Sequence, residues 1–190
     1  LALVVSRGGW CGRAARRLTQ LVDDWLSLSR IEAVIHARSY DILDLAGIAR
    51  QVVADVNAAH DKVAVVAAPG SASKVSLPGD AGQLAQLIRN LVENGIRHGA
   101  AGDPVSVEVA CEGENVRLVV ADKGAGIEPE HLPRLTERFY RVDPSRSRDA
   151  GGTGLGLAIV KHIVARHRGQ LDIASQPGRG TSVRVRLPGA

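Results

Sequence analysis

Aromatic residues are scarce in this sequence: phenylalanine, tyrosine and tryptophan together make up 3% of its 190 residues. Proteins that bind single-stranded nucleic acid stack the bases on aromatic side chains, so we expect no nucleic acid partner. The formal net charge of +4 does not change this expectation, because the basic residues are spread along the chain. The mild basicity fits a small polyanionic ligand, an acidic protein partner, or a contribution to solubility alone.

Three further absences concern cysteine, long apolar runs and methionine. The two cysteines, Cys11 and Cys111, show no metal-ligand spacing and are too few for a disulfide framework, which predicts unpaired thiols in a reducing, cytoplasmic setting. The N-terminal apolar run, residues 1–5, is far shorter than the roughly 20 residues that span a bilayer, so we expect no membrane span here. Methionine is absent altogether, the initiator included, which predicts a fragment or a processed product.

The overall composition is that of a folded globular protein with one core, since apolar residues make up 45% and charged residues 23%. Residues 1–12 are glycine-rich and are expected to be irregular. Within residues 13–40, apolar side chains recur at steps of three and four, which predicts an amphipathic helix over 13–32. That helix suits either pairing with another helix or capping of its own domain. Residues 41–190 are expected to form the main domain.

Helical and strand patterns are mixed in the main domain. One helix is predicted after Asp44, which is placed as its N-cap, a second begins at Asp80, and a third begins at about Leu155. Strands are predicted in five segments: 63–67, 105–111, 116–121, 170–175 and 182–187. The Pro-Gly pairs at 69–70 and 78–79 are expected in loops. The predicted fold is therefore α+β, a two-layer α/β sandwich in which helices cover a mixed, mostly antiparallel sheet, preceded by the N-terminal helix.

The helix predicted after Asp80 carries polar side chains on one face. Asn90, Asn94 and Arg97 fall at helical steps of four and three, whereas Leu87 and Leu91 point to the core. An amide oxygen is a hard ligand suited to Mg²⁺, and a guanidinium suits phosphate oxygens. The face therefore predicts a metal–phosphate site, and the alternative is that these side chains are merely solvated.

Two glycine-containing segments follow. Asp122 comes at the end of a predicted strand before Gly124 and Gly126, which places an acceptor-only carboxylate beside backbone that a planar ligand such as adenine can approach. A simple turn is the alternative. Residues 151–157 (GGTGLGL) run into the last predicted helix, whose N-terminal amides can bind phosphates. The glycine spacing matches neither the P-loop nor the Rossmann motif.

Four motifs in this order resemble the N, G1, F and G2 boxes of sensor histidine kinases. The matching segments are residues 90–98 (NLVENGIRH), 122–127 (DKGAGI), 137–141 (ERFYR) and 152–157 (GTGLGL). The resemblance covers about residues 44–188 and implies the Bergerat ATP-binding fold shared with gyrase B subunits, MutL and Hsp90. Residues 17–32 further resemble the second helix of the kinases' dimerisation and phosphotransfer hairpin.

The resemblance implies roles for the residues of the N box. Asn94 is expected to coordinate Mg²⁺, and Asn90, one turn earlier, to lie beside the phosphates of ATP. Arg97 stands where the family usually has a lysine facing phosphate, and His98 where an aromatic residue or histidine packs near the nucleotide. The ATP-hydrolysing members have a glutamate where this chain has Asn90, so hydrolysis is expected to be weak. Glu93 is a poor substitute because it lies about 100° further round the helix.

The other boxes imply the rest of the site. Asp122 is expected to accept the adenine amine, Phe139 and Tyr140 to form the base of a lid over about residues 142–151, and Arg141 to reach the γ-phosphate. The remaining residues implied to contact the nucleotide are Gly124, Gly126 and Ile127 around adenine, Gly152, Thr153, Gly154, Leu155, Gly156 and Leu157 in the glycine loop, and Thr181 on the last hairpin.

Together these roles imply an ATP- and Mg²⁺-dependent protein-histidine kinase with Asn90, Asn94 and Arg141 as its catalytic set. None of the six histidines stands in a sequence resembling the family's acceptor motif, so transfer is expected only in trans. The implied partners are ATP, a histidine-bearing dimerisation domain and a response regulator receiver domain, in the cytoplasm or below an inner-membrane anchor. Two alternatives are a non-catalytic ATP-binding module that regulates a kinase, and a serine kinase of the anti-sigma type, which the hairpin-like helix disfavours.

Overall fold

The computed structural model describes residues 41–59, 65–67, 75–100, 102–142 and 153–190, together with Thr19, Val22 and Leu26. Those three residues are helical and exposed, and the remainder of the helix predicted over 13–32 lies outside the described residues. Within the part of the chain that the structure describes, no helix is long and apolar enough to cross a membrane.

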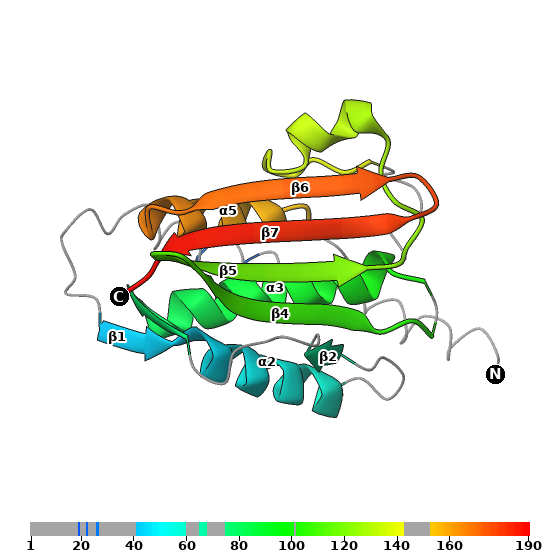
Figure 1. Cartoon of the computed structure of the whole chain (residues 1–190). Helices are drawn as coiled ribbons and strands as arrows, with labels where there is room; N and C mark the ends of the chain where they lie inside the picture. The colour runs from blue at the N-terminus through cyan, green and yellow to red at the C-terminus, as the bar shows by residue number, and fades with distance from the viewer. Residues whose placement is uncertain are drawn as a thin grey trace.

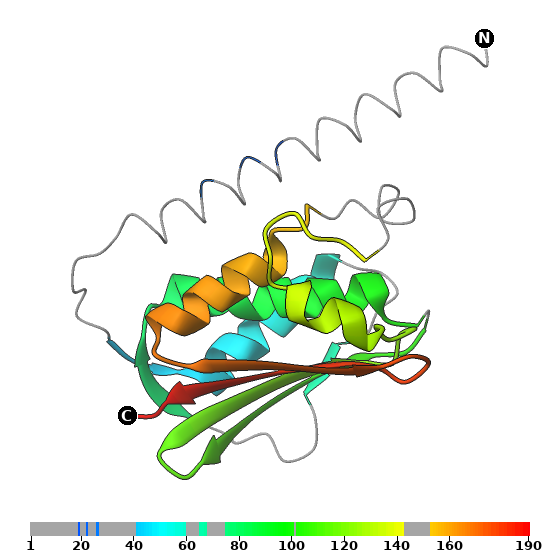
Figure 2. The same ribbon diagram turned by 90° about the horizontal axis from the view of Figure 1, so that it is seen from above.

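The described elements form a sheet with helices on one side. In chain order they are β1 (Asp41–Asp44), α2 (Leu45–Ala59), β2 (Val65–Ala67), β3 (Ser76–Gly79), α3 (Ala81–His98), β4 (Val105–Glu112), β5 (Asn115–Asp122), the 3-10 helix η1 (Pro129–Arg134), α5 (Gly156–Arg166), β6 (Gln170–Gln176) and β7 (Gly180–Pro188). The main sheet has the order β2-β4-β5-β7-β6, with β2 parallel to β4 and the other pairs antiparallel (Figure 1). Because α2, α3 and α5 lie on the same side of it (Figure 2), the predicted two-layer α+β fold is confirmed.

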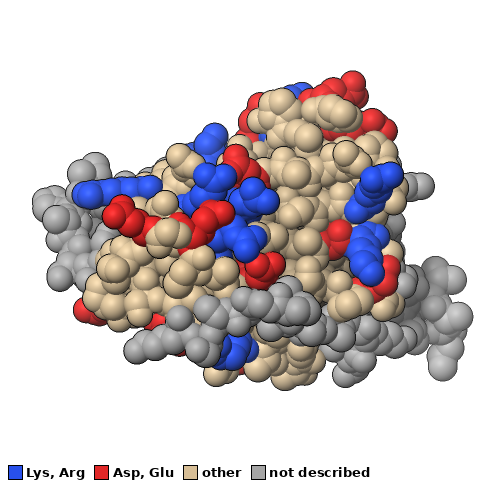
Figure 3. Space-filling view, viewed as in Figure 1, with Lys and Arg blue, Asp and Glu red and all other residues tan. Residues whose placement is uncertain are grey.

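The sheet has one apolar and one charged face because its strands alternate. The buried residues of β5 and β7 that face the helices are Val116, Leu118, Val120, Val183, Val185 and Leu187. The other face carries intermixed positive and negative side chains (Figure 3), including an ion pair of Arg117 with Glu108 at 2.6 Å. Side chains two residues apart on a strand point to the same face. Asp122, two residues after Val120, and Thr181, two residues before Val183, therefore also lie on the helix-facing side, at the end of the sheet.

The predicted N-cap Asp44 is confirmed, and Asp80, which was predicted to begin the next helix, is the N-cap of α3. The carboxylate of Asp44 accepts hydrogen bonds from the amides of Ala46 (3.1 Å) and Val75 (3.0 Å), and the Val75 bond is the main reason that the pKa of Asp44 is lowered. The carboxylate of Asp80 accepts from the amide of Gln83 at 3.0 Å, and α3 ends before Gly99. The helix that carries the predicted polar face is therefore fixed at its start by the residue that the sequence indicated.

Two short strands and a 3-10 helix were not predicted. Pro78 and Gly79 were expected in a loop, but they belong to β3, which pairs with β1 in a separate two-stranded sheet. Proline has no amide hydrogen to donate, but it is tolerated there because each strand of a two-stranded sheet is an edge strand. The helix η1 lies in a stretch for which no helix was predicted, and Pro129 at its first position fits such a start.

Candidate functional site

The polar face predicted on α3 is present and faces the start of α5. Asn90 and Asn94 are half-buried, while Leu87 and Leu91 of the same helix are buried in the core. A Cβ atom at Gly156, the first residue of α5, would lie 3.7 Å from Asn94 Nδ2 and 4.0 Å from Asn90 Oδ1. The two amides therefore border a space beneath the N-terminus of α5 that the missing side chain of Gly156 keeps open.

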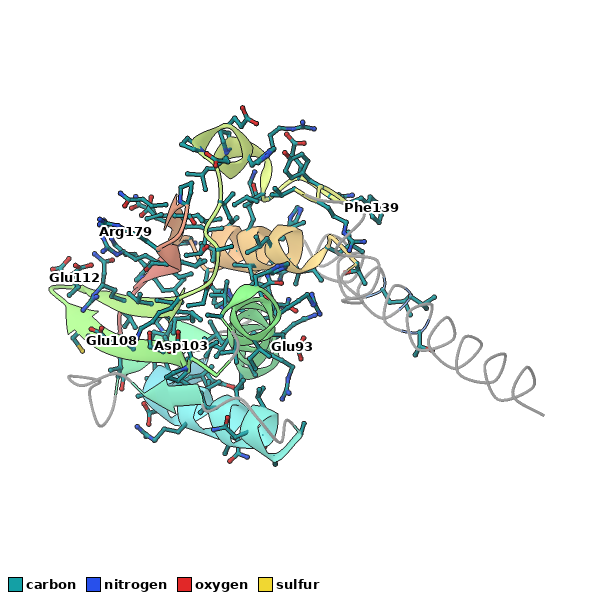
Figure 4. The ribbon with its side chains drawn as sticks, turned by 90° about the vertical axis from the view of Figure 1, so that its right-hand side faces the viewer. Glu93, Asp103, Glu108, Glu112, Phe139 and Arg179 are labelled. Carbon is teal, nitrogen blue, oxygen red and sulfur yellow. The ribbon has the colours of Figure 1, made fainter. Side chains whose placement is uncertain are left out.

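One of these amides is unsatisfied. The Nδ2 atom of Asn90 is buried and has no hydrogen-bond partner among the described residues. Burying such a donor without a partner costs about 1–3 kcal/mol, so the arrangement favours a ligand that brings an acceptor. Glu93, which precedes Asn94 on α3, projects on the side away from the sheet (Figure 4).

The N-terminus of α5 adds backbone donors to the same space. Among the described residues no side chain caps this helix, and its N-cap residue Leu155 donates its own amide to Thr153 Oγ1 at 3.3 Å. The uncapped amides of the first turn and the positive end of the helix dipole favour an anion. Leu155 is buried and Leu157 half-buried, so both anchor this turn, whereas Gly152 lies outside the described residues.

The residues before the predicted lid contact the end of the glycine loop at Gly154. The amide of Phe139 donates to the carbonyl of Gly154 at 2.9 Å, and both residues have positive φ angles, 63° and 75°. A Cβ atom at Gly154 would lie 2.9 Å from the Phe139 Cα, so glycine is required there by both conformation and space. The Phe139 side chain is 58% exposed and stands at the edge of the site (Figure 4).

Tyr140 and Arg141 lie in different directions. The Tyr140 hydroxyl lies 2.7 Å from His131 Nδ1, and the Arg134 guanidinium covers its ring at 4.2 Å from the centroid. These contacts hold the Tyr140 side chain against η1. Arg141 is half-buried and close enough to His98 to contribute to the lowering of the His98 pKa.

Asp122 forms the second part of the site, at the C-terminal end of α3. Its Oδ1 accepts a hydrogen bond from the Gly124 amide at 2.8 Å, and a Cβ at Gly124 would overlap the carbonyl of His98. Burial raises the pKa of Asp122, against the opposing effects of the Gly124 and Thr181 amides and of His98. For His98, burial lowers the pKa, Arg97 and Arg141 reinforce the shift, and Asp122 opposes it.

The loop after Asp122 is braced by the β6–β7 hairpin. The amide of Ile127 donates to Ser175 Oγ at 2.9 Å, the Gly178 amide donates to the Ala125 carbonyl at 2.7 Å, and a Cβ at Gly126 would overlap the Gln176 carbonyl. Sequence motifs did not single out Ser175. The sequence pattern that could have identified Ser175 is the alternation of β6. This alternation places Ser175 on the same face as Ile173, so that a polar residue stands at a core-facing position.

The two parts of the site are spaced like the two ends of a nucleotide. Gly99, which follows α3, lies near Asp122, since a Cβ there would be 3.5 Å from the Asp122 Cβ. At 1.5 Å per residue, Asn94 and Asn90 lie about 6 Å and about 12 Å back along the helix from His98. The arrangement offers an acceptor for a base amine at one end and donors for phosphates at the other.

A divalent metal at this site would need the phosphates of a bound nucleotide to complete its coordination shell. Among the described residues, no three His, Cys, Asp or Glu side chains are grouped to hold a metal ion. Mg²⁺ in proteins often takes one or two protein oxygens and completes its shell with water and substrate phosphates. Asn94, whose side-chain amide lies beside the start of α5, carries an oxygen of the kind that this role needs.

Comparison with known proteins gives a family match and named relatives. The family described as "Histidine kinase-, DNA gyrase B-, and HSP90-like ATPase" matches residues 79–190. The sensor-like histidine kinase SenX3 of Mycolicibacterium smegmatis is 36% identical over 174 residues, covering 92% of this chain and 45% of that protein. The phosphate regulon sensor protein PhoR of Pseudomonas aeruginosa is 39% identical over 173 residues, covering 88% and 38%. The chain thus spans less than half the length of these relatives.

Solved structures agree in fold. The mycobacterial sensor histidine kinase MprB matches with a TM-score of 0.67 at 28% identity, covering 79% of this chain and 97% of that one. Full-length ShkA in complex with AMPPNP matches with a TM-score of 0.75 at 30% identity, covering 91% of this chain and 36% of that one. The family match runs from the end of β3 to the C-terminal residue and so includes both parts of the site.

Proposed function

The chain belongs to the histidine kinase-, DNA gyrase B- and HSP90-like ATPase family, and from this premise we propose that it acts as the ATP-binding catalytic domain of a two-component sensor histidine kinase. In this role it transfers the γ-phosphoryl group of ATP to a histidine, for relay to a response regulator. The observation that carries the proposal is that Asn90 lies beside the start of α5 and has a buried Nδ2 with no hydrogen-bond partner among the described residues. It offers a donor to phosphate at a position where ATP-hydrolysing members have a glutamate.

ATP would supply the phosphoryl group, and Mg²⁺ would offset its negative charge. Asp122 accepts a hydrogen bond from the adenine amine and fixes the base, with Thr181 beside it. Asn90 and the first amides of α5 would donate to the phosphates, and the Asn94 side chain would supply an amide oxygen to the metal. By the resemblance, Arg141, which directly precedes the predicted lid, would reach the γ-phosphate.

Asn90 also decides between hydrolysis and transfer. A carboxylate at this position could take a proton from water, but an amide is not a base and cannot activate a nucleophile. The site therefore binds and orients the triphosphate without presenting it with activated water. The nucleophile must come from outside these residues, as a histidine side chain would.

The names of the relatives support the partners. SenX3 and MprB are sensor histidine kinases, and the ShkA structure contains AMPPNP, an ATP analogue. By similarity we propose a histidine-bearing dimerisation domain and a response regulator receiver domain as partners, with residues 13–40 as part of the dimerisation hairpin and 41–190 as the catalytic domain. A cytoplasmic location follows from the use of ATP and of a response regulator.

The decisive experiment is phosphoryl transfer with the acceptor supplied separately. The chain is incubated with γ-labelled ATP and Mg²⁺, with and without an added hairpin that carries the acceptor histidine, and any label is treated with acid and with base. We expect acid-labile, base-stable label on the hairpin alone, and none with the Asn94→Ala variant. ATP binding without any transfer would instead support a regulatory ATP-binding module.

A further inference from the structure

Three polar side chains form one cross-strand row at the end of the sheet's helix-facing side. Asp122 on β5 is paired with Thr181 on β7, and Thr181 is paired with Ser175 on β6. The preceding row on the same face is apolar and consists of Val120, Val183 and Ile173. Because paired residues of neighbouring strands point to the same side, the Ser175 hydroxyl meets the Thr181 hydroxyl at 2.9 Å.

The neighbours of Ser175 determine which way this hydroxyl bond runs. Its Oγ lies 2.8 Å from the Gly180 carbonyl, which can only accept, and 2.9 Å from the Ile127 amide, which can only donate. The single proton of Ser175 therefore goes to Gly180, and no proton remains for Thr181. The bond between the two hydroxyls must be donated by Thr181.

Thr181 is consequently left as an acceptor towards the site. Its one hydroxyl proton points at Ser175, so only lone pairs remain for a ligand beside Asp122. The Asp122 carboxylate is itself an acceptor when ionised. Two acceptors side by side favour a ligand that carries a donor, such as an exocyclic amine, and repel a carbonyl oxygen in the same place.

We propose that Ser175 is a positioning residue for base selectivity: by taking the Thr181 proton, it makes the base pocket acceptor-only and so selects a 6-amino purine over a 6-oxo purine. Ser175 acts through Thr181, since its own hydroxyl is occupied by Gly180 and Ile127. The inference rests on the proposed function, because it requires the base of the nucleotide to lie beside Asp122.

The test compares ATP with inosine triphosphate (ITP), which carries a 6-oxo group in place of the 6-amino group. Dissociation constants of both nucleotides with Mg²⁺ are measured by calorimetry for the whole chain and for Ser175→Ala. In the variant the Thr181 hydroxyl can rotate and donate to the 6-oxo group, so we expect the preference for ATP over ITP to fall about 5- to 10-fold. The matched control is Ser182→Ala, a residue next to Thr181 on the opposite face of β7, which should keep the wild-type ratio.

Further variants separate this role from a structural one. Ser175→Thr keeps a hydroxyl and should restore the wild-type ratio. In a Thr181→Val background, adding Ser175→Ala should change the ratio no further, because the group that it acts through is gone. A merely structural Ser175 would weaken both nucleotides alike and leave their ratio unchanged. If Ser175→Ala does not fold, Ser175→Cys takes its place, since a thiol is a weak acceptor and the same fall is expected.

The outcomes test the role of Ser175 separately from the proposed ATP-binding function. An unchanged ratio in Ser175→Ala, or an equal fall with and without Thr181, overturns the role of Ser175 while leaving ATP binding in place. If the wild-type chain binds neither nucleotide, the proposed function itself fails. A fall confined to chains that retain Thr181 supports the inference.

Discussion

The imidazole of His167, which follows α5, accepts a hydrogen bond at Nε2 from the backbone amide of Asp80, the N-cap of α3, at 3.2 Å. Its Nδ1 lies 2.8 Å from the Ile163 carbonyl and must carry the proton, so the buried ring is neutral. Burial lowers the pKa of His167 and Arg166 adds to the effect, while Ile163 and Asp80 oppose it. This ring joins the two helices between which the candidate site lies.

The first prediction is that the hydrogen-bonded His167 ring makes the stability of the fold depend on pH. With a native pKa below the unfolded value of about 6.5, the neutral ring stabilises the fold above that pH, and the stabilisation is lost as the pH falls towards the native pKa. His167→Gln should lower the free energy of unfolding at pH 8 by about 1–3 kcal/mol and reduce the further loss on going to pH 5. Urea unfolding at both pH values measures this.

The control for this prediction is His162→Gln on the same helix, where the side chain is only half-buried. It should keep the wild-type pH dependence. If His167→Gln loses as much stability between pH 8 and pH 5 as the wild type does, His167 is not the group responsible.

The second prediction concerns Asp122. Replacing the carboxylate in Asp122→Asn substitutes an amide for the acceptor that faces the adenine amine, which should weaken ATP binding about 10- to 150-fold, or about 1.5–3 kcal/mol. Titration calorimetry with ATP measures the change, and the exposed Glu128→Gln in the same loop is the control. An unchanged ATP affinity would refute the adenine role.

The third prediction separates metal binding from folding at Asn94. Asn94→Ala should weaken ATP binding in Mg²⁺ but change binding in EDTA far less, because only the metal loses a ligand. The melting temperature without nucleotide should remain close to that of the wild type. The adjacent Glu93→Gln should keep the Mg²⁺ dependence, and a collapse of the nucleotide-free Asn94→Ala variant would mark Asn94 as structural.

The fourth prediction concerns Tyr140, whose hydroxyl is paired with His131. Tyr140→Phe removes this bond but keeps the ring beneath Arg134, so stability should fall by about 1 kcal/mol and ATP affinity should stay within about threefold. Thermal unfolding and ATP titration measure the two effects. A tenfold loss of ATP affinity at unchanged stability would place the Tyr140 hydroxyl on the nucleotide instead.

The parts of the fold that the sequence predicted are those with a long local signal. The apolar repeat and Asp80 define α3 over five turns, so its polar face could be assigned before the structure was known. By contrast, β1 and β3 have four residues each and owe their existence to each other, which leaves little local pattern. The 3-10 helix η1, with six mostly polar residues, also has little local pattern.

The site shows the same limit. Asp122 and the glycine loop belong to contiguous motifs, whereas Ser175 matters only because β6, β7 and the loop after β5 come together. The direction of the Tyr140 side chain likewise depends on His131 and Arg134 in η1, whose presence was not predicted. Contacts made across elements are set by tertiary register, which a linear pattern does not record.

The last prediction tests the space beneath α5 directly. A Cβ atom at Gly156 meets only ordinary contacts at 3.7 Å or more, so Gly156→Ala should fold normally and gain up to about 1 kcal/mol from reduced chain entropy. The same methyl group would stand between Asn90 and Asn94, where we place the phosphates, and should weaken ATP binding at least tenfold. Gly95→Ala is the contrasting variant: its Cβ would lie 2.8 Å from Val105, so it should destabilise the fold. Thermal unfolding and ATP titration of both variants distinguish the cases, and full ATP affinity in Gly156→Ala would move the phosphates away from this space.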